Sequence, residues 1–158
     1  MHSGMLSGMG TTDNQKRRRA ERTRVFLQAL CEHFPQCFTA DRAAVRPLAI
    51  GIQATLKAAL TEHETLAETP AWLVRQALAR YTGSPAYLQA IIDGKPRINL
   101  QGETVEAVSP EAIAAAKDRR TQQKAAAEAR RKAQAEAAAA ERRAAKLNRL
   151  AEHFNNKD

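Results

Sequence analysis

The chain has 158 residues, of which 25 are Lys or Arg and 17 are Asp or Glu, so its formal net charge is +8. This length is enough for one ordinary domain with extensions. No apolar run approaches the roughly 18 to 20 residues that cross a bilayer, and the N-terminal residues lack the apolar stretch of a secretory signal. We expect a cytoplasmic monomer without a membrane partner. Aromatic residues are only 4% of the chain, which excludes a broad platform for stacked bases.

The basic charge is concentrated at the two ends of the chain. Residues 1–24 contain six basic and two acidic residues, and residues 117–158 contain twelve basic and six acidic residues. Residues 25–116 contain seven basic and nine acidic residues. Basic flanks of this kind are typical of proteins that bind a polyanion, because neutralising phosphates releases counterions. The alternative is that the charges only keep alanine-rich helices solvated.

The first half of the chain shows helical periodicity in two segments. Apolar residues recur at three- and four-residue spacing from residue 16 to 34, and Pro35 ends that run. Residues 35–48 form a predicted connector. A second helix is predicted from Leu48, because Leu48, Ile52, Leu56 and Leu60 recur every four residues; it frays near Glu64.

Two further helices are predicted around the sequence TGSP. Thr69 followed by Pro70 is a helix-start signal, which predicts a helix over 70–81. The next helix starts after TGSP and turns Leu88 and Ile91 toward the core. Tyr87 then lies about 100° off this apolar stripe, at the edge of the core.

A β-hairpin and a long last helix complete the prediction. Residues 97–108 alternate in polarity and turn near Gly102, with Ile98 facing inward and Arg97 outward. Ser109 and Pro110 open a last helix that continues into KAAAEARRKAQAEAAAAERRAAK. This tail lacks the large apolar residues of a coiled-coil seam. It is either a solvated helical arm or disordered.

The sequence contains no motif typical of an enzyme. It has no glycine-rich phosphate loop, no H-E-x-x-H and no G-x-S-x-G. Cys31, His33 and Cys37 lie close together, but structural zinc requires four ligands, and no matching second pair follows. We expect no catalysis, no metal and no cofactor, with both cysteines as small apolar residues.

The helix start at Ser84 is the candidate nucleic-acid site. The first amides of a helix have no partner within it and lie at the positive end of its dipole, which favours a phosphate. Gly83 keeps the approach open, Tyr87 offers a ring for stacking, and Arg97 offers a charge-assisted hydrogen bond. The alternative is a plain capped helix in which Tyr87 packs at the boundary of the core.

Four separated segments are FPQCF (34–38), RPLAIGI (46–52), LARYTGSPAYL (78–88) and PRINLQGE (96–103). In order and spacing they resemble the FinO/ProQ domain of bacterial RNA chaperones, over residues 22–118. The resemblance implies a compact, mostly helical α+β domain with a small β-hairpin. Residues 1–21 would then be a flexible basic leader and residues 119–158 a basic tail rich in Ala, Arg and Glu.

The resemblance also implies a function and a set of site residues. Family members bind intrinsic terminator hairpins with a 3′ uridine tail, stabilise small or antisense RNAs and promote their pairing with mRNA targets. Tyr87 and Arg97 match positions that line the pocket for the RNA 3′ end. The residues expected to approach the RNA backbone are Arg46, Arg75, Arg80, Thr82, Gly83, Ser84, Ala86 and Lys95.

The chain departs from the family pattern at two positions. Ala49 stands where lysine is frequent, and Ala79 stands where arginine is frequent. Arg80 compensates only if it turns toward the RNA. The competing function is that of a basic scaffold or duplex-DNA-binding protein that does not recognise an RNA end.

Overall fold

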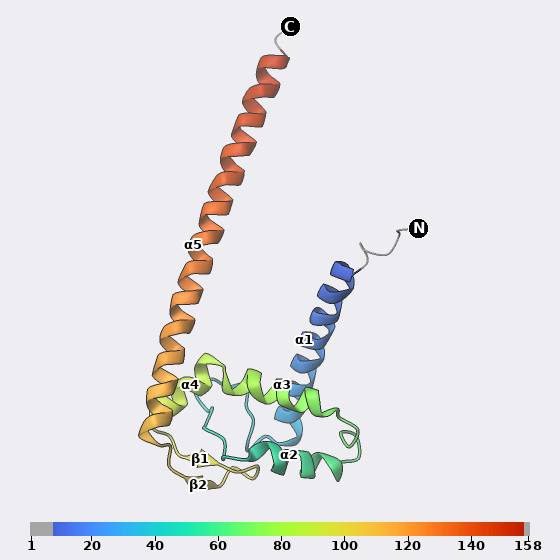
Figure 1. Cartoon of the computed structure of the whole chain (residues 1–158), viewed down its shortest axis with the longest axis vertical. Coiled ribbons are helices and arrows are strands. Elements are labelled where there is room, and N and C mark those ends of the chain that lie inside the picture. Colours follow the sequence, from blue (N-terminus) through green and yellow to red (C-terminus); the bar gives the residue numbers. More distant parts are fainter. Residues whose placement is uncertain (1–7, 157–158) are drawn as a thin grey trace. The chain divides into compact units, whose positions relative to one another are not determined.

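The computed structural model describes residues 8–156. The elements are α1 (Gly8–His33), α2 (Ile52–Thr61), α3 (Ala71–Thr82), α4 (Pro85–Ile92), β1 (Arg97–Ile98), β2 (Thr104–Glu106) and α5 (Pro110–Asn155) (Figure 1). The chain divides after Lys117 into two compact units. The first contains the core and the second is the remainder of α5. The mostly helical α+β prediction is confirmed.

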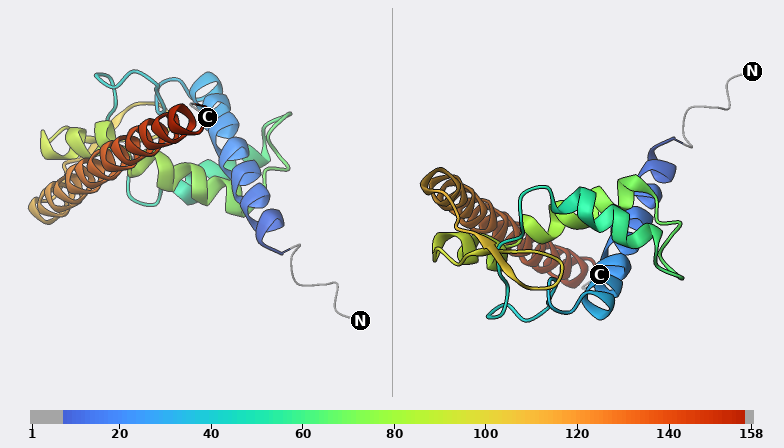
Figure 2. Two further views of the ribbon diagram at one scale, coloured as in Figure 1. Left: turned by 90° about the horizontal axis from the view of Figure 1, so that it is seen from above. Right: turned by 90° about the horizontal axis from the view of Figure 1, so that it is seen from below.

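Helix α3 is the centre of the first unit. It packs against α1, α2 and α4 (Figure 2). Leu30 of α1, Leu56 of α2 and Ala77 of α3 have no exposed surface and lie in the core. One polar side chain, Thr23, is buried at the junction of α1 and α3, where its Oγ1 lies 2.8 Å from the Arg19 carbonyl and 3.3 Å from Gln76 Oε1.

The connector between α1 and α2 is an unexpected third partner of the hairpin. Leu48 forms an isolated parallel bridge with Ile98, in which Ile98 N donates to Pro47 O at 2.9 Å and Ala49 N donates to Ile98 O at 2.8 Å. The prediction that a helix begins at Leu48 is therefore wrong. Helix α2 begins four residues later at Ile52, after Gly51 has reversed the chain with φ +80°.

The hairpin is confirmed with β1 antiparallel to β2. Ile98 is buried as predicted. The side chain of Asn99 holds the turn by accepting hydrogen bonds from the amides of Gln101 and Glu103 at 3.0 and 2.9 Å. Gly102 closes the turn with φ +79°, and a Cβ there would lie 2.8 Å from the Gln36 carbonyl. The turn therefore packs directly on the start of the connector.

The ends of the described chain are more helical than expected. Helix α1 starts at Gly8, so residues 8–21 of the predicted flexible leader are helical and continue into the core helix. Residues 1–7 lie outside the described part. Helix α5 runs for 46 residues, which decides the open question of the tail in favour of a helix up to Asn155. Within residues 8–156, no helix is both long and apolar enough to span a membrane.

Candidate functional site

The start of α4 is a capped helix with few spare donors. Ser84 is the N-cap, and its Oγ accepts the amide of Tyr87 at 3.2 Å while donating to the Tyr81 carbonyl at 2.8 Å. Pro85 has no amide hydrogen. Helix geometry therefore leaves the Ala86 amide as the donor of this first turn that has no acceptor within α4. The predicted phosphate site therefore has one free backbone donor in the first turn of α4, the Ala86 amide, instead of several.

The preceding turn is similarly self-contained. Thr82 Oγ1 donates to the Leu78 carbonyl at 2.8 Å, and Gly83 N donates to the Ala79 carbonyl at 2.9 Å. Thr82, Gly83, Ser84 and Ala86 are each half-buried. Their hydrogen bonds fix the shape of the turn between α3 and α4.

Tyr87 and Arg97 meet at a single residue, Leu48. The Tyr87 hydroxyl accepts the Leu48 amide at 3.0 Å, and Arg97 Nη1 donates to the Leu48 carbonyl at 2.9 Å. A guanidinium carries five N–H donors, and the bond to Leu48 uses one of them. The other N–H groups of Arg97 can bind other acceptors. The structure thus brings the two predicted pocket residues together through the amide and the carbonyl of one residue.

The predicted position of Tyr87 at the edge of the core is wrong. Its side chain is 6% exposed, and its ring lies edge-on to Tyr81 with centroids 5.9 Å apart. The single-stripe prediction failed because the connector packs on α4 from a second side, through Leu48. The buried Tyr87 ring is therefore not an open stacking surface, and its hydroxyl binds the same residue that Arg97 binds.

Arg46 and Lys95 hold the connector in place. Arg46 donates to the carbonyls of Gly102 and Gln36, each at 3.3 Å, and so links the hairpin turn to the segment after α1. Lys95 Nζ lies 3.3 Å from the Ala43 carbonyl. Both side chains are half-buried. Their positive charges therefore lie at the surface of the connector, with part of their hydrogen bonding already used.

Arg75 and Arg80 extend from α3 into solvent. Both are exposed, and the only ion pair among residues 8–156 joins Arg24 to Glu21. The two arginines are five residues apart, about 140° around the helix. They therefore lie on different faces of α3. Arg75 lies on the same face as Trp72 and Ala79.

Sequence reasoning missed a cation and aromatic cluster where α1 meets α3. The guanidinium carbons of Arg19 and Arg22 lie 5.2 and 5.1 Å from the centroid of the half-buried Trp72 ring. The signal was available, because Arg19 and Arg22 are three residues apart on one helix face and Trp72 stands in the first turn of α3. This packing fixes two positive charges at one end of α3.

The cysteines and histidines do not assemble a metal centre in the described part of the chain, where no cluster of three or more potential ligands occurs. His33 and His63 pair with each other, with ring nitrogens 3.2 Å apart. Cys37 is buried, and burial raises the pKa of its thiol to about 12, although the nearby Arg46 opposes the shift. Burial also raises the pKa of Tyr81 to about 12.

The model of the ProQ/FINO family matches residues 20–134. The chain belongs to the ProQ/FinO family. Among curated relatives it is 40% identical over 96 residues to the RNA chaperone ProQ of Idiomarina loihiensis, covering 61% of this chain and 44% of the relative. It is 34% identical over 102 residues to the RNA chaperone ProQ of Haemophilus influenzae, covering 65% and 50%. The chain thus spans about half the length of these curated ProQ relatives.

Solved structures agree with the family assignment. A ProQ homolog from Legionella pneumophila is 32% identical with a TM-score of 0.52, covering 64% of this chain and 81% of that one. A FinO-like RNA chaperone from Neisseria meningitidis is 25% identical with a TM-score of 0.51, covering 66% and 80%. The ProQ/FinO fold predicted from the sequence is therefore confirmed.

Proposed function

We propose that this ProQ/FinO family member is a non-enzymatic, RNA-binding chaperone in the bacterial cytoplasm. It recognises intrinsic terminator hairpins that end in a 3′ single-stranded tail. By holding that end it stabilises small or antisense RNAs and promotes their pairing with mRNA targets. The names of the curated relatives and of the Neisseria structure support the coarser part of this proposal, which is the chaperone activity.

The observation that carries the finer part is the convergence of Tyr87 and Arg97 on Leu48. Arg97 retains donors that suit the phosphate or ribose of a terminal nucleotide. Tyr87 supports this arginine indirectly, because it fixes the amide of the residue whose carbonyl Arg97 binds. The Ala86 amide, one residue before Tyr87, donates a hydrogen bond to a neighbouring phosphate in this proposal.

The remaining predicted residues have graded roles in this proposal. Arg75 and Arg80 are exposed and contact the backbone of the hairpin stem. Arg46 and Lys95 shape the connector and add positive charge. Residues 22–118 are the RNA-binding domain, and residues 1–21 and 119–158 are basic extensions. The start of the family match at residue 20 supports the first boundary, and the division of the chain after Lys117 supports the second, although the family match continues to residue 134.

The test compares three forms of one terminator hairpin: with a tail ending in a 3′ hydroxyl, with a tail ending in a 3′ phosphate, and without a tail. We expect the wild type to prefer the first form. Replacing Arg97 with alanine should weaken the binding of this form by roughly 10- to 150-fold, the worth of one charge-assisted hydrogen bond. It should lower the affinity for the tailless hairpin only slightly, through the loss of one charge. Equal binding of all three forms by the wild type would instead support a basic scaffold without end recognition.

A matched control is available on α2. Lys57 is exposed, and α2 packs on α3 rather than on α4 or the hairpin. Lys57→Ala removes the same charge as Arg97→Ala. It should lower the affinity for all three RNAs slightly and equally. A loss of end preference in Lys57→Ala as large as that in Arg97→Ala would overturn the assignment of the pocket to Arg97.

A further inference from the structure

Helix α5 carries five basic residues on a single line. They are Arg120, Lys124, Arg131, Arg142 and Arg149, here called the basic stripe. Their spacings are 4, 7, 11 and 7 residues. At about 100° per residue these steps return each side chain to within roughly 40° of the same direction. With a rise of about 1.5 Å per residue, the basic stripe is about 43 Å long.

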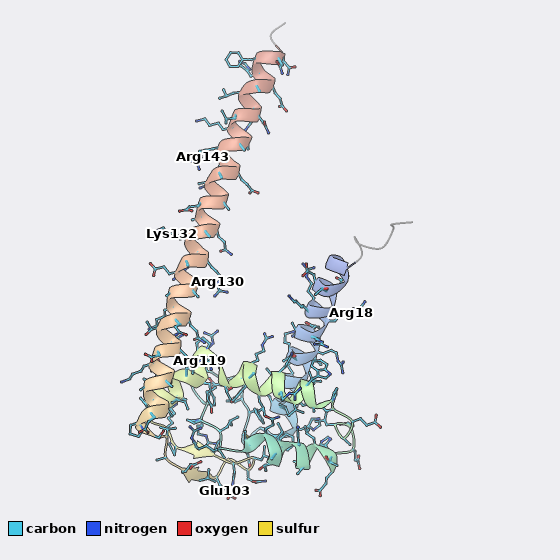
Figure 3. The ribbon with its side chains drawn as sticks, in the orientation of Figure 1. Arg18, Glu103, Arg119, Arg130, Lys132 and Arg143 are labelled. Carbon is cyan, nitrogen blue, oxygen red and sulfur yellow. The ribbon has the colours of Figure 1, made fainter. Side chains whose placement is uncertain are left out.

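Other basic residues of α5 lie off this line. Arg119 and Arg130 project to one side of the helix, and Lys132 and Arg143 project to the other (Figure 3). Each of these pairs is also eleven residues apart, which is close to three full turns. The basic stripe runs between the two pairs. The three rows of positive charge are parallel and together extend over more than half of the circumference of the helix.

The charges of the basic stripe are not neutralised within the described chain. Lys124, Arg131, Arg142 and Arg149 are exposed, and Arg120 is half-buried. None of the five forms an ion pair with any residue between 8 and 156. Glu128, one turn after Lys124, borders the stripe without occupying it. The line is therefore available to an anionic partner.

The surroundings of the basic stripe select the class of partner. Between residues 118 and 146 α5 has no aromatic and no large apolar residue. This stretch therefore lacks the apolar face of a membrane-surface helix, the seam of a coiled coil and the rings that stack on single-stranded bases. The exposed Leu147, Leu150 and Phe154 lie beyond it, around the last residue of the stripe. A row of charges along a helix fits a partner that is itself straight and densely charged, as a nucleic-acid duplex is.

We propose that the basic stripe binds the phosphate backbone of duplex RNA, independently of its sequence and of any free 3′ end. This inference rests on the proposed function, because it assigns the stem of a structured RNA to α5. The site at Arg97 holds the end of the RNA, and α5 holds paired segments. The alignment of the charges, and not only their number, determines this affinity.

The first experiment disperses the stripe in the full chain without changing the net charge. Lys124→Ala with Ala126→Lys, and Arg142→Ala with Ala144→Lys, each move a positive charge by two residues, about 200° around the helix. The probe is a blunt RNA duplex of about 16 base pairs, the length that a small double-strand-binding module spans. We expect binding about 2- to 30-fold weaker than wild type. The log-log salt slope should fall by roughly 1.5, at ~0.7 to 0.9 per lost contact.

The second experiment extends the stripe. Ala138 lies on its line, within the eleven-residue gap between Arg131 and Arg142, whereas Ala140 lies on the opposite face; both are exposed. Ala138→Lys should raise duplex affinity and the salt slope by about one contact, or ~0.8. Ala140→Lys adds the same charge to the same alanine-rich helix and should have a smaller effect. Circular dichroism checks that helix content is unchanged in all variants.

The outcomes separate this proposal from the proposed function. If the dispersed variant matches the wild type, or if Ala138→Lys and Ala140→Lys act equally, only net charge matters and the stripe is wrong. If the dispersed variant loses binding to single-stranded RNA or anionic lipid vesicles but not to the duplex, the partner class is wrong. The preference for a 3′ hydroxyl tail should persist in every variant. Its absence in the wild type would refute the proposed function and leave the stripe standing.

Discussion

Both the amide and the carbonyl of Leu48 form hydrogen bonds with side chains from other elements. Its amide donates to Tyr87 of α4, and its carbonyl accepts from Arg97 of β1. Both contacts are needed, because a buried peptide group without a partner costs about 1 to 3 kcal/mol. A change at Tyr87 therefore reaches Arg97 through Leu48, without direct contact between the two side chains.

Tyr87→Phe should separate positioning from packing. Tyr87→Ala would remove a buried ring, at roughly 3 to 5 kcal/mol, and would confuse unfolding with loss of binding. The phenylalanine variant keeps the ring and removes only the acceptor of the Leu48 amide. We expect the free energy of unfolding to fall by about 1 to 3 kcal/mol, and the preference for tailed over tailless RNA to decrease. Urea denaturation and binding titrations measure the two effects.

Tyr81→Phe is the matched control for this change. Tyr81 is equally buried, and its hydroxyl accepts the Thr39 amide at 3.3 Å. Loss of the Tyr81 hydroxyl should lower the free energy of unfolding in a similar way and leave the preference for the RNA tail intact. If the two phenylalanine variants change that preference equally, Tyr87 has only a structural role.

Cys37 should make the fold sensitive to alkaline pH. Burial raises the pKa of its thiol from an ordinary 9.0 to about 12. Since the folded-state pKa is the higher one, the stabilisation is complete below pH 9 and is lost as the pH rises toward 12. Denaturation at pH 8, 10 and 11 should show this decline. Cys37→Ala should change the free energy of unfolding at every pH. Its decline with rising pH should become shallower, because only the contribution of Tyr81 remains. An unchanged slope would contradict the assignment.

At the scale of elements, the hairpin turn is anchored rather than free. Gly102 lies against the Gln36 carbonyl, and Arg46 binds both residues' carbonyls. The turn, the end of α1 and the connector therefore form one unit. This unit determines where β1 lies, and with it Leu48 and Arg97.

Gly102→Ala should destabilise the protein more than Gly51→Ala. Both glycines have positive φ, which costs an alanine about 1 to 2 kcal/mol. A Cβ at Gly51 meets no atom within 4 Å, whereas at Gly102 it would lie 2.8 Å from Gln36 O. We expect the clash to add roughly 1 kcal/mol or more for Gly102→Ala. Equal losses in the two variants, measured by thermal or urea unfolding, would mean that the turn moves away from the connector at no cost.

The elements themselves were predictable from the sequence, but the packing around the connector was not. Helices over 70–81 and after TGSP, and a turn near Gly102, follow from caps, proline and glycine, which act locally. The start of α2 was misplaced because Leu48 continues the four-residue apolar spacing of α2, although it lies in a bridge with Ile98 of β1 and its own amide and carbonyl bind Tyr87 and Arg97. Period alone does not reveal such a long-range bridge. For the same reason it placed Tyr87 at the edge of the core instead of inside it.

The candidate site residues also fall into two groups: those whose exposure follows from a local pattern and those whose contacts are long-range. Arg75 and Arg80 were predictable as exposed charges because a helical period decides exposure. The carbonyl partners of Arg46, Lys95 and Arg97 all lie in segments outside regular helices, at Gln36, Ala43, Leu48 and Gly102. No local pattern determines those contacts. The alternation of the hairpin placed Arg97 on the polar face, but it did not single out Arg46 or Lys95.

At the scale of the whole molecule, the two units should contribute differently to RNA binding. Residues 118–158 contain eleven basic and six acidic residues, while Tyr87 and Arg97 belong to the first unit. A chain ending at Lys117 should therefore keep its preference for tailed RNA and lose general affinity. If all five charges of the basic stripe are lost as contacts, the log-log salt slope should fall by roughly 3.5 to 4.5, at ~0.7 to 0.9 each. An unchanged slope would show that this part of α5 does not contact the RNA.

Helix α5 also differs from the core in how it should exchange hydrogen with solvent. From residue 118 to 146 it has no large apolar side chain, so intrinsic propensity and i,i+4 hydrogen bonds alone stabilise its backbone. Amides of such a helix open by local fraying rather than by global unfolding. In deuterated solvent they should exchange long before those of α3, although both are helical. Binding of duplex RNA along α5 should slow that exchange without any change in structure.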